Sequence, residues 1–347
     1  MSLQPRPNSP AALGYRWPAE WEPHAATWLS WPRNRDSWPG KFEPVPPIFA
    51  RMVAAIAEHE PVHINAGRPE VMEEAKRLVG HLKNVTLHDF PTNDAWCRDH
   101  GPMFLIPPPG QPPALIDWEY NAWGGKYPPF DFDNAVPGHV AKYLGMKRYV
   151  PGIILEGGSV DGNGRGTILT TTSCLLNPNR NADLTQSQVE QYLADYCGAK
   201  NVLWLEGHFA GDDTDGHIDQ LARFVGPRTV VTIREDDPSD ENHEPLADNL
   251  KRLQSFADQD GLPLEIVTIP LPKPKYQDEQ RLPAGYCNFY IANGLVLVPT
   301  FGDPADEVAI DTLARLMPDR KVVGLDSLDL IWGLGSFHCL SQQQPRA

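Results

Sequence analysis

Nine short runs rich in β-branched residues alternate with five helix-like stretches, and this alternation limits the fold more than any other feature. Gly, Pro, Asn or Asp bounds each run, which is typical of short strands that end in turns. The predicted strands are 61–67, 84–90, 114–120, 166–172, 201–206, 228–235, 264–272, 294–302 and 321–327, and the predicted helices are 47–59, 68–83, 185–197, 243–258 and 305–317. We therefore expect a mixed α/β fold.

Two of the predicted helices carry clear local signals. In the stretch 68–83, four apolar residues fall on one stripe at helical spacing: Val71, Ala75, Leu78 and Leu82. The stretch 185–197 begins at Thr185, a residue type that caps helices, and is followed by Gly198. The 36 prolines and 28 glycines fit this picture as turn residues between many short elements.

Charge and composition exclude several classes of protein. The formal net charge of −15 is wrong for a nucleic-acid binder, which needs a basic surface, and suits attraction of small cations. No apolar run approaches the ~20 residues of a membrane span, and residues 1–17 lack the apolar stretch of a signal peptide. The five cysteines are odd in number and widely spaced, which argues against a disulfide framework or a structural zinc site. We expect a cytoplasmic protein with reduced thiols and no membrane or nucleic-acid partner.

The polar clusters that could carry chemistry recur at a steady pitch. Asp99 lies in WCRDHGP, Glu156 follows 57 residues later in EGGSVDG, and His217 follows 61 residues after that in DGHID. Cys339 comes 122 residues further on, which is twice 61. A period of ~60 residues predicts five stacked units around an axis, with one silent unit between His217 and Cys339. The polar ends of such units would converge on the axis.

Each cluster allows a functional and a structural interpretation. Cys339, preceded by glycines, is either a thiolate nucleophile or a small buried hydrophobe. His217 and Asp219 would share one face of an extended strand as a proton-transfer pair, or be an ordinary loop histidine and turn acid. His208 lies nine residues from His217, which gives only poor support to a metal site.

The remaining two clusters suit a cation. Trp96 beside Asp99 would present a ring face and a carboxylate to an organic cation, although Arg98 and Asp99 could instead form a simple ion pair. Glu156 ends an apolar strand beside two glycines, where ligands often bind. The following residues, TILTTT, are not helical, so this glycine run does not predict a dinucleotide site.

A thiol surrounded by carboxylates favours a guanidinium substrate. The planar N–H fork of a guanidinium is matched by carboxylates such as Asp99, Glu156 and Asp219, which would also aim its central carbon at the sulfur. A peptide bond would call for an oxyanion hole and not for a cluster of acids. We therefore prefer C–N cleavage of a guanidinium to proteolysis.

Several motifs, in order along nearly the whole chain, resemble the agmatine deiminase / bacterial peptidylarginine-deiminase-like family of the guanidine-modifying, or pentein, superfamily. They are PAEWEPHAATWLSWP (18–32), WCRDHGP, EGGS, CLLNPNRN, GHID, PAGYCNFYIANGLVLVP (283–299) and FHCLSQQQP. The resemblance implies one catalytic domain over residues 1–347, built as a five-bladed β/α-propeller of pseudo-fivefold ββαβ units. It implies agmatine deiminase activity with no cofactor and no metal.

The resemblance also gives each candidate residue a role. Cys339 matches the nucleophile, which forms a covalent amidino intermediate, and His217 matches the general acid/base. The residues that match guanidinium or substrate contacts are acidic or aromatic: Asp99, Asp219, Glu156 and Trp96. Cys97 and His100 depart from the Met and Thr that are common in the family.

Residues 333–337 depart from the family's usual glycine run. The sequence therefore leaves three substrates open, which differ in the tail that carries the guanidino group: agmatine, free arginine and peptidyl-arginine. A dihydrolase, an amidinotransferase and an inactive guanidine-binding module are further alternatives. The expected binding partner is a small cationic guanidino compound. The chain could also assemble into a homo-oligomer.

Overall fold

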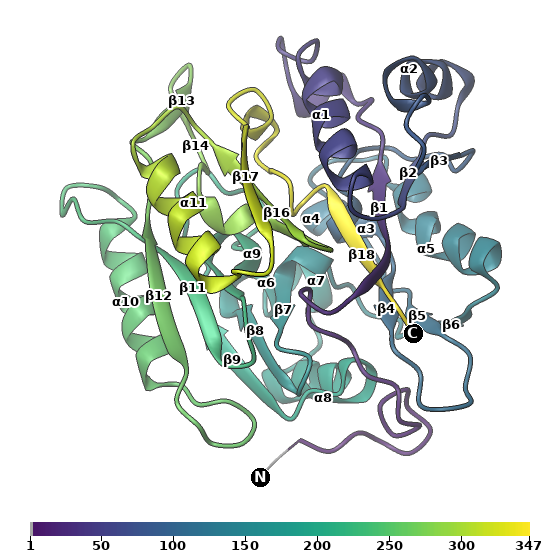
Figure 1. Ribbon diagram of the computed structural model, residues 1–347. Helices are drawn as coiled ribbons and strands as arrows, with labels where there is room; N and C mark the ends of the chain where they lie inside the picture. Colours follow the sequence, from purple (N-terminus) through teal and green to yellow (C-terminus); the bar gives the residue numbers. More distant parts are fainter. Residues whose placement is uncertain (1–2) are drawn as a thin grey trace.

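The computed structural model describes residues 3–347, so residues 1 and 2 of the expected domain lie outside the described residues. The fold is mixed α/β, as predicted (Figure 1). All nine predicted strands form: β2 (Val62–Asn65), β3 (Val85–His88), β5 (Ala114–Ile116), β8 (Thr167–Thr171), β9 (Asn201–Leu205), β11 (Thr229–Arg234), β12 (Glu265–Pro270), β16 (Leu295–Thr300) and β17 (Lys321–Asp326). The five predicted helices form as well: α1 (Val45–Ala57), α2 (Pro69–Val79), α8 (Gln186–Cys197), α10 (His243–Ser255) and α11 (Ala305–Leu316).

The helix signals act as expected. Thr185 closes a capping box with Gln188 at the start of α8, and Gly198 adopts a left-handed conformation (φ 73°) at its end. Val71 and Ala75 on the predicted stripe of α2 are buried, together with Val79. The amphipathic pattern therefore records which side of the helix packs against the protein.

Several elements escaped prediction because they are very short or interrupted. Most are strands of three residues, too short to show a period: β4 (Met103–Leu105), β6 (Lys147–Tyr149), β7 (Val160–Gly162), β10 (Ala222–Phe224), β15 (Tyr290–Ala292) and the hairpin β13 (Lys275–Gln277) and β14 (Gln280–Leu282). The longer β1 (His24–Ser30) and β18 (Ser341–Pro345) pair with each other from opposite ends of the chain. Helix α5 (Asp131–Leu144) contains Pro137, which masks its helical pattern.

One strand pattern recurs in five sheets within residues 3–347. A first strand pairs antiparallel with a second, the second pairs parallel with a third, and a helix connects the second to the third. The sheets are β4-β5-β6, β7-β8-β9, β10-β11-β12, β15-β16-β17 and β18-β1-β2-β3. In the last of these the end of the chain supplies the first strand, which lies beside β1 in Figure 1. The recurrence agrees with the ~60-residue pitch, while the placement of the units around one axis stays a prediction.

The polar clusters sit at equivalent places in these units. Each occupies the short segment just before the first strand of its sheet: α3 (Cys97–His100) before β4, η2 (Gly157–Ser159) before β7, α9 (Ile218–Leu221) before β10, η3 (Tyr286–Asn288) before β15, and His338-Cys339 before β18. The unit that looked silent in the sequence therefore contributes Asn288. Equivalent segments of the repeat gather the chemistry-bearing side chains.

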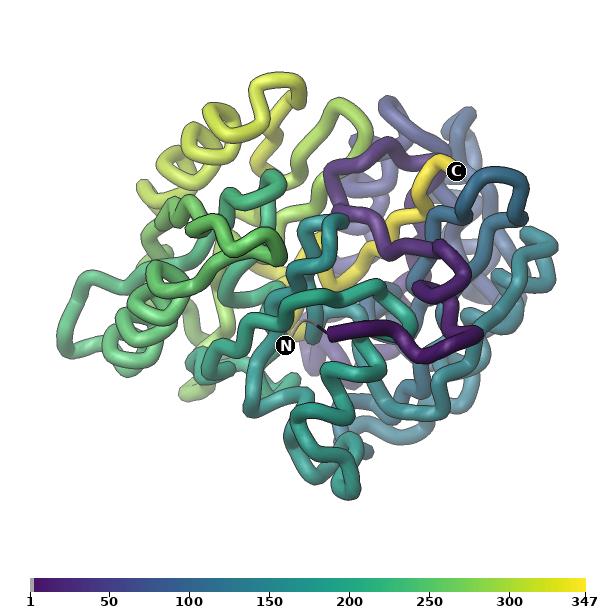
Figure 2. The backbone as a smooth tube through the Cα atoms, turned by 90° about the horizontal axis from the view of Figure 1, so that it is seen from below, coloured from purple at the N-terminus to yellow at the C-terminus, as the bar shows by residue number. Residues whose placement is uncertain are grey.

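Aromatic packing holds the segment around Cys339 in place. Trp31, Trp38, Trp96, Phe337 and Cys339 belong to one buried cluster, and each fully buried large side chain stabilises the fold by about 1.5–3 kcal/mol. The N-terminal segment packs along α8 (Figure 2), where the Ala11 amide donates to the carbonyl of Asp195 at 3.0 Å. Among residues 3–347, no helix combines the length and apolar character that crossing a membrane requires.

Candidate active site

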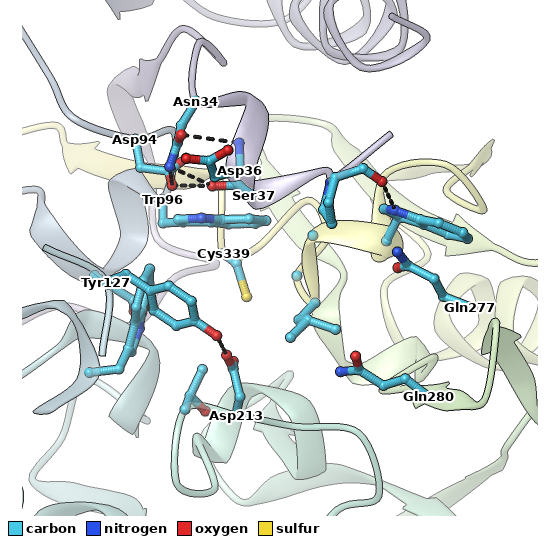
Figure 3. A pocket seen from close by; sticks show the side chains of 18 residues that line it. Asn34, Asp36, Ser37, Asp94, Trp96, Tyr127, Asp213, Gln277, Gln280 and Cys339 are labelled. Carbon is cyan, nitrogen blue, oxygen red and sulfur yellow. Dashed lines mark hydrogen bonds between the residues drawn. The ribbon is translucent and has the colours of Figure 1, made fainter. Parts of the chain in front are cut away.

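A cavity of about 200 Å³ lies over the sulfur of Cys339 (Figure 3). Trp96, Asp99 and Cys339, three of the predicted site residues, line it. Its other acidic wall residues are Asp36, Asp94 and Asp213, and no Lys, Arg or His is among the described residues of the wall. The cavity is therefore built for a small cation.

Cys339 lies where its sulfur meets one donor and one acceptor. The side chain is 4% exposed. Its Sγ is 3.0 Å from Asn288 Nδ2 and 3.6 Å from Asp219 Oδ2. Burial raises the pKa of the thiol well above its usual range, and the charges of Asp219 and Asp99 raise it further, against the lowering effect of the Asn288 amide. The free protein thus holds a neutral thiol, and a bound cation would favour its ionisation.

Asp219 is fixed from behind by the residue next to the cysteine. His338 Nδ1 donates to Asp219 Oδ2 at 2.7 Å, while His338 Nε2 donates to Glu20 Oε2 at 2.8 Å. Burial alone would raise the pKa of Asp219, but the hydrogen bond and charge of His338, with the charges of His217 and Arg223, together outweigh it, and the pKa ends below its usual value. The other oxygen of Asp219, Oδ1, has no hydrogen-bond partner among the described residues and is free to accept one from a ligand.

Asp99 presents its carboxylate to the cavity between two donors. Its Oδ1 accepts from the Gly158 amide and its Oδ2 from Trp123 Nε1, both at 3.0 Å. Burial raises the pKa of Asp99 to about 6, with the charges of Asp219 and Glu156 acting in the same direction. Gly158 must be glycine here, because a Cβ would lie 2.6 Å from His217 Nδ1 and 2.8 Å from Asp99 Oδ1.

His217 is fully buried behind the cavity wall, with Nδ1 3.6 Å from Asp99 Oδ1. Neither ring nitrogen has a hydrogen-bond partner within residues 3–347. Burial lowers the pKa of His217, but Asp99, Cys174 and Glu156 together outweigh it and hold the pKa well above its usual value. Above about pH 6, His217 and Asp99 therefore form an ion pair, and His217 carries a proton that it can give to a ligand.

Glu156 lies beside His217 and not on the cavity wall. Its Oε1 accepts from Arg180 Nε at 2.7 Å, both side chains are fully buried, and Oε2 has no partner among the described residues. Glu156, Cys174 and His217 each offer one possible metal ligand, and these atoms lie within 4.8 Å of one another. Among residues 3–347, this is the group whose spacing would admit a metal ion. The Arg180 guanidinium would oppose such an ion, and His208 is exposed and outside this group.

Other functional residues were missed by sequence reasoning. Asn288 contacts Cys339 and Trp123 contacts Asp99, while Glu20 contacts His338, the partner of Asp219. A neutral amide, an indole or a distant acid carries no signal of its own in the sequence. The ~60-residue pitch could have pointed to Asn288. Cys97 and His100, the departures from the family pattern, are buried and do not line the cavity; His100 Nε2 contacts Ser30 Oγ at 2.8 Å.

The chain is similar over almost its full length to proteins that act on guanidino groups. The sequence pattern of the Porphyromonas-type peptidyl-arginine deiminase family matches residues 16–345. Agmatine deiminase of Pseudomonas syringae pv. syringae is 36% identical over 361 residues, which cover 97% of this chain and 97% of that protein.

Solved structures give the same result. Agmatine deiminase of Enterococcus faecalis superposes with a TM-score of 0.92 at 31% identity, covering 99% of each chain. A substrate-bound agmatine deiminase of C. jejuni superposes with a TM-score of 0.88 at 33% identity, covering 96% of each chain. Both therefore share this mixed α/β fold from end to end.

Proposed function

The chain belongs to the Porphyromonas-type peptidyl-arginine deiminase family, and on this basis we propose that it is an agmatine deiminase. The enzyme hydrolyses a C–N bond of the guanidino group, so that agmatine and water give N-carbamoylputrescine and ammonia. The cavity supports this function through one arrangement above all. The thiol of Cys339 and the carboxylate of Asp99 line one cavity. Asp219 is fully buried and not among the wall residues, but it lies 3.6 Å from the sulfur, and its Oδ1 has no hydrogen-bond partner among the described residues.

In the proposed mechanism, binding of the cationic substrate favours the thiolate form of Cys339. Asp99 and Asp219 hold the guanidinium by charge-assisted hydrogen bonds, and its positive charge offsets the acids that keep the thiol neutral. The Cys339 sulfur gives its proton to water and bonds to the central carbon, whose C=N π electrons move onto nitrogen. His217 gives a proton to the departing nitrogen, which leaves as ammonia.

The second half of the mechanism uses the same histidine in reverse. His217, now neutral, takes a proton from water as the oxygen bonds to the central carbon of the S-linked amidino intermediate. The C–S bond breaks with its electron pair on the sulfur, which takes the hydroxyl proton as the C=O group forms, and the ureido product leaves. The reaction consumes only substrate and water, so it calls for no cofactor or metal. Glu156, held by Arg180, keeps negative charge beside His217.

The cavity favours agmatine over free arginine. The two compounds share the guanidino group, but arginine adds a carboxylate at the far end. The four aspartates of the wall would repel that carboxylate, and the described part of the wall offers it no Lys, Arg or His. A terminal ammonium such as that of agmatine meets no such repulsion.

Ammonia release from agmatine, arginine and a peptidyl-arginine tests this assignment. We expect turnover of agmatine with one ammonia and one ureido product for each substrate, and slow or absent turnover of arginine. Preference for the peptide would instead make the chain a peptidylarginine deiminase. Transfer of the amidino group to an added amine would make it an amidinotransferase, and binding without turnover would make it a guanidine-binding module.

The finer architecture belongs to the same proposal. We expect one catalytic domain in which the five sheets surround the cavity as a five-bladed β/α-propeller of the pentein type. The recurrence of one strand pattern and the common position of the polar segments support this arrangement. A cytoplasmic location and a homo-oligomer stay predictions.

A further inference from the structure

We propose that Asn288 is a catalytic residue whose side-chain amide donates a hydrogen bond to the attacking sulfur of Cys339. This deepens the proposed function and depends on it only in taking Cys339 as the nucleophile. Asn288 is fully buried at the end of η3, in the unit that looked silent in the sequence. Its Nδ2 lies 3.0 Å from Cys339 Sγ.

The orientation of this amide follows from its neighbours. Asn288 Oδ1 accepts from the backbone amides of Ser336 at 3.1 Å and Cys339 at 3.2 Å. A backbone N–H can only donate, so the amide oxygen must face these two groups. The NH₂ group is thereby turned toward the sulfur. The Asn288 carbonyl also accepts from the His338 amide at 3.1 Å, so the residue is tied to the nucleophile segment at three points.

The contact changes strength when the sulfur ionises. An N–H bond to a thiolate is charge-assisted, and it is stronger than an N–H bond to a neutral thiol. Asp219 Oδ2, 3.6 Å from Sγ, can only accept while it is ionised, so it serves the thiol form and repels the thiolate. Asn288 thus stabilises the reactive thiolate, which the neighbouring carboxylates destabilise. Such selective stabilisation of the reacting form is what catalysis requires.

Asn288→Asp separates donation to the sulfur from the structural role. The carboxylate keeps an oxygen for the two backbone amides and replaces the donor to the sulfur with an acceptor. Asn242→Asp is the matched control, because Asn242 is also buried and its Oδ1 also accepts from a backbone amide, that of Ala210 at 2.8 Å. Asn242 does not line the cavity.

The readout is alkylation of Cys339 by iodoacetamide between pH 7 and pH 10.5, followed by mass spectrometry of its peptide. We expect Asn288→Asp to slow alkylation by about tenfold or more at a given pH and to move the pH midpoint upward. Asn242→Asp should leave both unchanged. Alkylation needs no turnover, so failure to process agmatine would refute the proposed function and leave this test intact. Wild-type rate and midpoint in folded Asn288→Asp would overturn the proposal.

A second measurement covers the case in which the variant does not fold. In the wild-type protein labelled with ¹⁵N-asparagine, the Asn288 side-chain amide signal should shift with the same pH midpoint as Cys339 alkylation. The shift should disappear in Cys339→Ser. An Asn288 signal that ignores ionisation of the sulfur would equally overturn the proposal.

Discussion

His338 donates from Nδ1 to Asp219 Oδ2 at 2.7 Å, and its other ring nitrogen meets Glu20 Oε2 at 2.8 Å. An imidazole with a carboxylate on each nitrogen donates at both, and it is therefore positively charged. His338 offsets the charge of Asp219 and orients it beside the sulfur. It is a fixed partner of the two acids, whereas the ring nitrogens of His217 have no hydrogen-bond partner in the described part of the chain and can move a proton.

Replacing His338 by Gln should destabilise the protein strongly. The change leaves the buried Asp219 without its hydrogen-bonded cation, and breaking such a buried pair costs about 3–5 kcal/mol of unfolding free energy. Glu20 loses one cation as well but keeps its ion pairs with Arg98 and Arg223. Urea denaturation at pH 7 measures the loss. His81→Gln, the same change at an exposed position, should leave the midpoint in place. Equal midpoints for His338→Gln and the wild type would contradict a charged His338.

Asp99→Asn should make stability depend less on pH. The folded-state pKa of Asp99 is about 6, above the unfolded value of about 4, so folding favours the protonated acid. Its contribution to stability is present below about pH 4 and is lost as the pH rises to about 6. The variant escapes this loss, so its stability relative to the wild type should rise across that window by at most about 3 kcal/mol.

Asp117→Asn controls the Asp99 experiment. Burial raises the pKa of Asp117 to about 6 as well, but this residue lies outside the cavity wall. Asp117→Asn should show the same pH trend in urea denaturation and keep its turnover of agmatine. Asp99→Asn should lose about a hundredfold or more of that turnover. A flat stability difference for Asp99→Asn between pH 4 and pH 7 would be incompatible with the raised pKa.

The sequence predicts regular elements better than it predicts contacts. Strands such as β11 and β16 are β-branched runs with clear ends, so their composition alone predicts buried strands. The three-residue strands β4 and β15 form only because a neighbouring strand pairs with them, and no local pattern records that pairing. Cys339 and His217 could be predicted as site residues because few residue types perform their chemistry. Asn288 and Glu20 act through contacts that span 51 and 318 positions of chain, which one sequence does not reveal.

His217→Ala should remove most of the activity on agmatine. The proposed mechanism uses this side chain twice, first as the acid and then as the base, and such a group contributes about 10²–10⁴-fold. Ammonia release gives the rate. His208→Ala is the control, because His208 lies nine residues away but is exposed and outside the cavity. Comparable rates for both variants would remove His217 from the mechanism.

Cys339→Ser should lose turnover by about a thousandfold or more and stay folded, because a hydroxyl is a far weaker nucleophile than a thiolate. Agmatine turnover and thermal unfolding should be measured on the same sample. Cys197→Ser changes another buried thiol, at the end of α8 and away from the cavity, and should keep the activity. Retained turnover in Cys339→Ser would defeat the nucleophile assignment.

Gly335→Ala should disturb the site without touching a polar group. A Cβ at this position would lie 2.4 Å from Trp96 Cζ3 and 3.1 Å from Cys339 Cβ, so the indole or the nucleophile segment must move. Trp96 is held by stacking on Trp38, with ring centroids 5.3 Å apart, and cannot yield freely. A misplacement of about 1 Å at a reacting centre costs on the order of a hundredfold in rate, so kcat should fall by about that factor. Gly226→Ala is the matched control, because its nearest neighbour would be Thr229 Oγ1 at an ordinary 3.5 Å. If steady-state kinetics gave both variants the wild-type kcat, the close approach of Gly335 to Trp96 would have no part in placing the sulfur.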